Sequence, residues 1–510
     1  MSLQLDLYEL IHTMSKTEKR YFSIFAKSNK SRDVNYLALF EAFSELGEFD
    51  EKLLVRKFLK KLENSPFKDP EDYTQLSQDT QYLYKTLLRA MRDYMQKSSV
   101  QIQIRDLLSD AIFLRDRGLY QQADKRIVRA RKLAQTYHNN VALLEVNRLE
   151  RSLIWSVEGT NAVSKTEALI AEKDAIMQSL KEEMEHEDLY ANISNMVNHQ
   201  NQFVANDEQV KRVKDDAEAL FAKKESAPPA FAKLRQYHIE ALLAMGENRL
   251  EECEGILEEM MTWWETNKSL KEEESFRYQI SLSKLLTFLS QSDQHDKLMA
   301  RIEEIREANK DMPNGEAILF RFAIFYELFY YINNKKVDEA YSMLPYIEAG
   351  MAKYAIPIKR KIALSYNAAT VCFLKNEFEA CDAWLVKILT YARNNIRKDV
   401  MRKAFLLRLI VLENKADASE QALEAAKKYF REEKKVPAKE KIEVQVLNLL
   451  MDAMTGPVLD QPKLTKKFLA ELEDLQSTPL SSRLNGLVEF YLWCKSRIEK
   501  KSILEVFMKS

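Results

Sequence analysis

Glycine and proline are scarce in this sequence, which has only nine glycines and eleven prolines among its 510 residues. Sheet proteins need Gly, Asn and Pro at their many tight turns, so this scarcity argues against β and α/β folds. Apolar residues make up 46% of the chain, which is enough for extensive burial. Leucine, alanine, glutamate and lysine are abundant, and these residues favour helix. The composition therefore predicts an all-α protein.

The sequence also lacks an excess of charge of one sign and a leader peptide. The net charge is −1 with acids and bases interleaved, so no long-range field is expected to attract nucleic acid or an anionic membrane. Residues 1–14 carry acids within their apolar stretch and no basic leader, unlike a signal peptide. The four cysteines are scattered, which is typical of reduced core thiols in a cytoplasmic protein. They are Cys253, Cys372, Cys381 and Cys494.

Motifs for catalysis and cofactor binding are absent from the sequence. No glycine-rich phosphate-binding loop is present, and the cysteines lack the spacing of metal ligands. Glu183 and His186 have the spacing of a carboxylate-bridged metal pair, but such sites need a second copy, which the sequence lacks. A charged, solvent-exposed helix face is the expected alternative. We therefore expect no enzyme activity, no cofactor and no metal.

Helical hairpins recur along most of the chain. Residues 365–392 are the clearest copy, with two amphipathic helices joined by a polar turn at residues 375–377. A small or apolar residue begins the second helix of each hairpin, and from Val210 onward it recurs every 41 to 45 residues. These positions are Ala123, a poorly defined one near Ala168, Val210, Cys253, Leu298, Ala340, Cys381, Ala422 and Leu464. One hairpin cannot bury its apolar face alone, so the series predicts stacked repeats.

Four copies share a turn residue, an apolar residue two positions later, and a small residue three positions beyond that. Their turns contain Gly118, Asn248, Lys335 and Asn376, and their small residues are Ala123, Cys253, Ala340 and Cys381. Over about residues 104–475 this pattern resembles the tetratricopeptide-repeat superfamily. The period of about 42 exceeds the usual 34, and the usual early aromatic and final proline are mostly missing. The resemblance implies a right-handed superhelical α-solenoid of tetratricopeptide-like hairpins whose concave face binds other macromolecules.

The spacing divides the chain into three predicted parts. Residues 1–98 do not share the repeat period and predict an N-terminal helical bundle, residues 99–480 predict the solenoid, and residues 481–510 predict a helix that caps the final repeat. Pro345 falls inside a second helix and predicts a kink there. The segment 15–22 resembles the opening of a group of bacterial helical-repeat proteins, a resemblance that implies no function.

The N-terminal bundle contains one basic helix. Its basic residues are Lys52, Arg56, Lys57, Lys60 and Lys61. A helix-turn-helix that contacts DNA is one interpretation. A solvated outer face is the favoured alternative, because acidic residues flank the helix and the block as a whole is close to neutral.

A polar stripe on one first helix is the candidate partner-binding site. Asn192, Asn195, His199 and Gln202 follow one another at steps of three and four residues, so they share a helix face. Amides both donate and accept hydrogen bonds, so such a stripe suits the backbone of an extended peptide. Neighbouring first helices would extend the site with Arg148, Arg151, Arg235, His238 and Asn367. A solvated polar face without a ligand is the alternative.

These observations favour a non-enzymatic scaffold that binds a protein or peptide on the concave face of a repeat array. The arginines would suit a peptide with acidic side chains or a free C-terminus. The alternative hypothesis is a peptide-responsive regulator whose N-terminal bundle contacts DNA or an effector protein, and a subunit of a larger assembly is a third. Neither a nucleic-acid partner nor a membrane is expected for the leading hypothesis.

Overall fold

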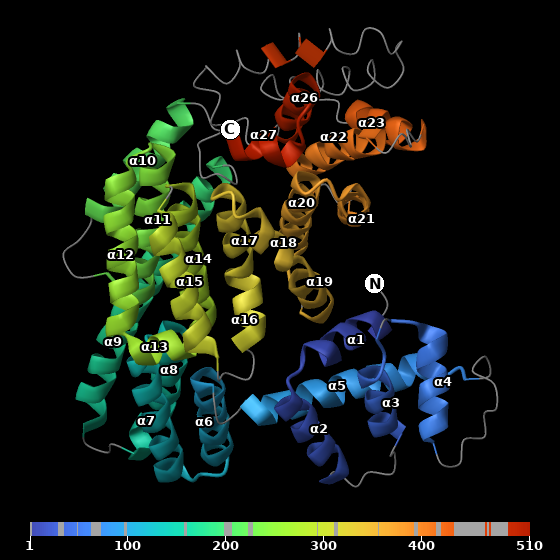
Figure 1. Cartoon of the computed structure of the whole chain (residues 1–510). Coiled ribbons are helices and arrows are strands. Elements are labelled where there is room, and N and C mark those ends of the chain that lie inside the picture. The colour runs from blue at the N-terminus through green and yellow to red at the C-terminus, as the bar shows by residue number, and fades with distance from the viewer. Residues whose placement is uncertain are drawn as a thin grey trace. The chain divides into compact units, whose positions relative to one another are not determined.

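The chain folds into α-helices throughout the part that can be described. The computed structural model describes residues 3–28, 35–47, 49–62, 73–95, 99–157, 161–197, 207–222, 228–292, 294–310, 315–354, 356–391, 396–414, 420–432, 465–466, 469–470 and 488–509. Within these ranges every regular element is a helix (Figure 1), which confirms the all-α prediction.

The helices form two compact units, residues 1–294 and 295–510. The first unit contains α1 (Leu3–Thr13), α2 (Lys16–Ser28), α3 (Asn35–Ser44), α4 (Glu51–Lys61), α5 (Leu76–Met95), α6 (Val100–Arg115), α7 (Tyr120–Thr136), α8 (Asn140–Val157), α9 (Ala162–Met196), α10 (Asp207–Ala222), α11 (Ala230–Gly246), α12 (Leu250–Thr266), α13 (Lys268–Glu273) and α14 (Ser275–Gln291). The second contains α15 (His295–Asn309), α16 (Gly315–Phe322), α17 (Ile324–Asn333), α18 (Val337–Ser342), α19 (Leu344–Lys353), α20 (Ile358–Leu374), α21 (Phe378–Leu389), α22 (Lys398–Asn414), α23 (Glu420–Glu432), α26 (Val488–Glu499) and α27 (Ile503–Lys509). The boundaries at residues 98 and 480 stay predictions.

Helices α1 to α5 enclose a hydrophobic core of their own, in which Leu7, Phe22 and Phe58 are fully buried. The entry to α2 follows from its sequence. The Ser15 amide donates to Glu18 Oε2 at 2.7 Å, and the Glu18 amide donates to Ser15 Oγ at 3.2 Å. This reciprocal pair is a capping box, which satisfies backbone donors that the first turn of a helix would otherwise leave unpaired.

The four best repeat copies turn in the same way. Gly118, Asn248, Lys335 and Asn376 have φ values of 75°, 59°, 57° and 60°. In each turn the next amide donates to the carbonyl oxygen five residues earlier. The pairs are Leu119 to Leu114 at 3.0 Å, Arg249 to Ala244 at 2.8 Å, Lys336 to Tyr331 at 2.9 Å and Glu377 to Cys372 at 2.8 Å. This is the Schellman arrangement, in which one left-handed residue ends the first helix.

Replacing Lys335 with glycine is expected to raise the free energy of unfolding by about 0.5–1 kcal/mol. Lysine carries a steric penalty at a φ of 57°, and glycine carries none. Lys336 is the matched control, because its φ is −84° and its amine also makes one surface contact. Lys336→Gly should change the free energy of unfolding by less than about 0.5 kcal/mol, because Lys336 is the N-cap residue of α18, where glycine is well tolerated. Urea denaturation of both variants measures this difference, and destabilisation by Lys335→Gly would contradict the prediction.

The small residues predicted to lie between the helices of each hairpin are buried. Ala123, Cys253, Ala340 and Cys381 have 0% of their surface exposed. All four cysteines of the chain are free and buried, as expected of core thiols. Burial raises the pKa of Cys253 to about 12, so this thiol stays protonated and serves packing.

Helix α9 explains why the copy near Ala168 was poorly defined. It runs unbroken over residues 162–196, a stretch that contains neither glycine nor proline to end it. Its first half joins the core of α6 to α8 through Ile176, whereas Leu189 and Ile193 in its second half pack with α10 and α11. One helix therefore serves as the second helix of one hairpin and the first helix of the next.

Pro345 breaks its helix, as predicted. Helix α18 ends at Ser342, and α19 begins at Leu344 with Pro345 in its first turn. A proline is tolerated there because the amides of the first turn have no partner within the helix.

The C-terminal segment forms two helices instead of the single helix expected for residues 481–510. Helix α26 packs against α22, and α27 packs against α20. Thr370 Oγ1 on α20 donates to Glu489 Oε1 on α26 at 2.7 Å. Among the described residues, the chain end therefore packs on helices that precede the last predicted repeat.

Candidate functional site

The first helices of successive hairpins are joined by polar contacts about one repeat apart. Asn140 Nδ2 on α8 donates to Glu183 Oε1 on α9 at 2.9 Å, across 43 residues of sequence. On the next pair of helices, an Arg235 amine on α11 donates to Glu187 Oε1 on α9 at 2.6 Å, across 48 residues. Helices α9, α11 and α14 are neighbours in this array (Figure 1). Their shared side is the candidate site.

The centre of this side is Tyr190 on α9, with two cations beside its ring. The Arg235 guanidinium lies 4.3 Å from the ring centroid, and Lys284 Nζ of α14 lies 5.3 Å from it. Burial would raise the pKa of the phenol, but the charges and hydrogen bonds around it, led by those of Lys284, together outweigh burial and lower the pKa of Tyr190. The phenol is therefore held in an electropositive environment. We call Tyr190, Arg235, His238, Arg277, Ser281 and Lys284 the Tyr190 cluster.

His238 contacts Arg235 from the interior of the protein. Its Nδ1 lies 3.2 Å from an Arg235 amine, and its Nε2 lies 3.1 Å from Ser281 Oγ. Arginine can only donate, so Nδ1 accepts and Nε2 carries the proton that it donates to Ser281. Burial and then the charge of Arg235 lower the pKa of His238 well below its usual value, so the ring is neutral. Its side chain is 2% exposed, so it orients Arg235 and does not reach the surface.

Arg277 is the third cation of the cluster, and it stacks on a ring of the neighbouring helix. Its guanidinium lies 4.5 Å from the Phe231 ring centroid on α11. It also approaches Glu187 at 3.7 Å and Glu274 at 3.2 Å. Glu187 is therefore shared between Arg235 and Arg277, and its side chain is 46% exposed. Two arginine side chains therefore contact the same partly exposed carboxylate, that of Glu187.

The structure brings only part of the predicted stripe to this site. Arg235 and His238 belong to the Tyr190 cluster, with His238 in the interior. Asn192 and Asn195 are exposed, but at 100° per residue they lie roughly 140–160° around α9 from Tyr190. The predicted amide stripe is therefore on another face. His199 and Gln202 lie outside the described residues.

The remaining predicted residues are placed apart from the Tyr190 cluster. Arg148 and Arg151 are exposed on α8. Asn367 on α20 is half-buried in the second unit, and its Nδ2 has no partner. Asn367 lies about one turn before Thr370, which donates to Glu489 on α26, so α26 packs near this side of α20.

The sequence reasoning missed four residues of the Tyr190 cluster, namely Tyr190, Arg277, Ser281 and Lys284. Arg277 follows Arg235 by 42 residues and Ser281 follows His238 by 43, so one repeat period separates each pair. The repeat period could therefore have identified both Arg277 and Ser281. Lys284 had no such signal, because its equivalent one period earlier is Leu242.

Family models, curated proteins and solved structures all give no match for this chain. Function is therefore argued from the residues alone.

The described residues offer no sign of a metal centre or a membrane span. Among them, no three His, Cys, Asp or Glu side chains come together closely enough to hold a metal ion. No helix in the described ranges combines the length and the apolar character needed to cross a bilayer.

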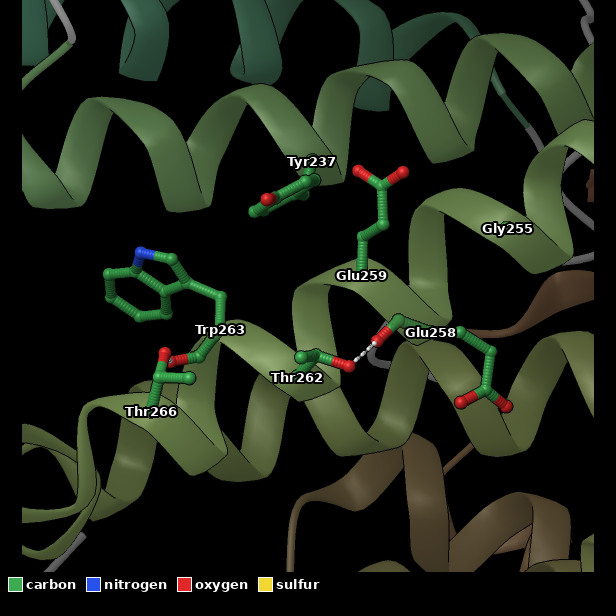
Figure 2. A pocket seen from close by; sticks show the side chains of 7 residues that line it. All are labelled: Tyr237, Gly255, Glu258, Glu259, Thr262, Trp263 and Thr266. Carbon is green, nitrogen blue, oxygen red and sulfur yellow. Dashed lines mark hydrogen bonds between the residues drawn. The ribbon is translucent and has the colours of Figure 1, made fainter.

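An open hollow of about 560 Å³ lies along α11 and α12 (Figure 2). Tyr237 and Trp263 supply aromatic rings, and Glu258 and Glu259 supply carboxylates. Aromatic rings with nearby carboxylates suit a cationic group. However, Lys233 Nζ already lies 4.4 Å from the Tyr237 ring centroid, so the chain's own lysine occupies one cation position. The hollow is a weaker candidate than the Tyr190 cluster.

The basic helix α4 has part of its charge paired within the bundle. Lys61 Nζ lies 2.6 Å from Glu45, which directly follows α3, and 3.4 Å from Glu41 on α3. Lys57 Nζ lies 3.7 Å from Glu45. These pairs reduce the field that a DNA contact would need, so they favour the solvated-face interpretation.

Proposed function

We propose that this chain is a non-enzymatic scaffold that binds a protein or peptide on the side formed by its first helices. In this proposal the hairpins form a right-handed, tetratricopeptide-like α-solenoid. Four hairpins with the same Schellman turn support it, as does packing mainly between helices adjacent in sequence. Contacts about one period apart between first helices also support it.

The Tyr190 cluster carries the proposal. Arg235, Arg277 and Lys284 extend from two neighbouring helices towards one side, and arginines bind planar carboxylates through paired hydrogen bonds. Glu187 occupies this position within the chain, and its exposure lets an incoming carboxylate replace it. The expected ligand is a peptide segment with acidic side chains or a free C-terminus.

Peptides that differ in their carboxylate groups test this function. A library of eight-residue peptides, each with a free or an amidated C-terminus and with or without Asp and Glu, is screened against the full chain. We expect binding to concentrate in carboxylate-bearing peptides. Replacing both Arg277 and Lys284 with glutamine should weaken it at least tenfold, because hydrogen bonds to charged groups contribute about 1.5–3 kcal/mol each.

The matched control is Arg301→Gln, which removes a partly exposed arginine from the second unit. It should leave binding unchanged. Retained affinity in the Arg277 and Lys284 double variant, with its helix content intact by circular dichroism, would remove the Tyr190 cluster as the site. Binding indifferent to carboxylates would remove the proposed ligand class.

A further inference from the structure

Four apolar side chains lie exposed in a line along α9. Val163, Ile170, Met177 and Met184 follow one another at intervals of seven residues. They are 59%, 40%, 55% and 65% exposed, respectively. Single exposed apolar residues are common on protein surfaces, but four in one register are a different observation. We call them the α9 stripe.

The spacing of the α9 stripe suits contact with a second helix. Seven residues are slightly less than two helical turns, so the four side chains drift slowly around α9 in a left-handed sense. At 1.5 Å per residue they extend over about 30 Å. The same period forms the contact seam when two helices pack side by side in a coiled coil. The stripe turns away from Tyr190, so it is separate from the Tyr190 cluster.

One border of the stripe is mainly acidic, and the other border is mixed. Four positions after each apolar residue come Glu167, Asp174, Lys181 and Asp188, all exposed. Asp174 pairs with Lys173 at 2.8 Å, but a pair this exposed contributes little and can exchange. Helix α9 carries eight acidic side chains against three lysines. An apolar line with an acidic border is complementary to an amphipathic helix with a basic border.

Methionine suits such a contact. Its unbranched side chain adapts to different apolar partners, and methionine-rich surfaces commonly receive amphipathic helices. Two of the four stripe residues are methionines. Beyond Met184, the exposed amides Asn192 and Asn195 continue the same side of α9, where they could pair with polar groups of the bound helix.

We propose that the α9 stripe docks an amphipathic helix of a partner protein whose apolar face is bordered by lysine or arginine. A second copy of this chain is a poorer occupant. Two α9 helices packed side by side would bring acidic borders together, and like charges at helix contacts are destabilising. This proposal does not depend on the Tyr190 cluster or on its ligand.

Two designed peptides test the docking. Both are 21 residues long with leucine at the first and fourth positions of each heptad. One carries lysine and the other glutamate at the remaining border positions. Fluorescence anisotropy with the full chain should show saturable binding of the lysine peptide, weakened by salt, and at least tenfold weaker binding of the glutamate peptide. Failure of the lysine peptide to bind would overturn the proposal.

Substitutions on α9 locate the binding. Replacing Met177 and Met184 together with glutamine should weaken the lysine peptide at least tenfold, because both side chains would lose apolar burial on binding. Met508→Gln is the matched control, since Met508 is 49% exposed in α27, and it should change nothing. Reversing Glu167, Asp174 and Asp188 to lysine should transfer the preference to the glutamate peptide.

Two further outcomes would overturn the proposal. Unchanged binding of the lysine peptide by the double methionine variant would place the contact elsewhere. Sedimentation showing a dimer that the same variant dissociates would make a second copy the occupant. Peptide binding and sedimentation both report on α9 whether or not the Tyr190 cluster binds carboxylates.

Discussion

Replacing Arg131 with methionine is expected to lower the free energy of unfolding by about 3–5 kcal/mol. Arg131 on α7 donates to both oxygens of Glu150, at 2.9 and 2.6 Å, and also to Glu172 on α9. Glu150 is only 8% exposed. Methionine leaves this carboxylate buried without its cation, and that cost dominates the change.

Arg126→Met is the matched control for this prediction. Arg126 lies on the same helix, and its ion pair with Asp110 spans 3.7 Å with both side chains well exposed. Its loss should change the free energy of unfolding by less than about 1 kcal/mol. Urea unfolding of both variants, followed by circular dichroism, measures the difference. Equal effects would show that the Arg131 cluster contributes no more than a surface pair.

The pH dependence of the same cluster has a defined sign. Burial would raise the pKa of Glu172, but hydrogen bonds from Arg131 and Asn147 outweigh burial and lower it. A carboxyl whose pKa is lowered by folding adds stability above its ordinary pKa of 4.5, and this stability is lost as the pH falls through the folded-state value. The difference in free energy of unfolding between wild type and Arg131→Met should therefore become smaller below about pH 4.5.

Two glycine-to-alanine substitutions are expected to act in opposite directions. A Cβ at Gly350 on α19 would lie 2.1, 2.5 and 2.6 Å from three ring atoms of Phe320. Phe320 is fully buried and has no room to retreat, so Gly350→Ala should destabilise by about 1–3 kcal/mol or more. A Cβ at Gly255 on α12 would meet nothing within 4 Å. Gly255→Ala should therefore stabilise by about 0.5–1 kcal/mol.

Urea midpoints of the two variants and of wild type measure this contrast. Because both substitutions add the same methyl group, the helix-propensity gain is common to both, and the difference isolates the collision with Phe320. Destabilisation by Gly255→Ala would contradict the open space at that position, and stabilisation by Gly350→Ala would contradict the close packing of α16 and α19. A gain at Gly350 would be the clearest contradiction.

Much of the fold could be predicted because local chemistry decided it. Ser15 and Glu18 satisfy neighbouring backbone groups, Asn376 tolerates a positive φ, and Pro345 removes a backbone donor. Each of these effects is local in sequence, so the sequence pattern alone was sufficient to predict these features. Continuity through α9 could not be predicted in the same way, because it rests on the absence of any breaking residue, whereas the small residue near Ala168 predicts the start of a new helix.

The candidate site could be predicted only in part. Arg235 was expected at the surface of a first helix, and the structure adds its contacts with Tyr190 and Glu187. The burial of His238 was not foreseeable, because it depends on how α14 packs against α11 and presents Ser281. Side-chain direction across helices is a tertiary property. Sequence spacing gives the positions of residues around one helix, but it does not give the orientation of the neighbouring helices.

The dual role of α9 limits how this chain can gain or lose repeats. A one-period segment between two consecutive left-handed turns, such as those at Lys335 and Asn376, can be duplicated or deleted as a cassette, because both of its ends lie in turns between helices. No such junction exists between residues 162 and 196, where a cut would sever a continuous helix shared by two cores. The hairpins on either side of α9 are thus inseparable, and insertions that alter repeat number are confined to the turns.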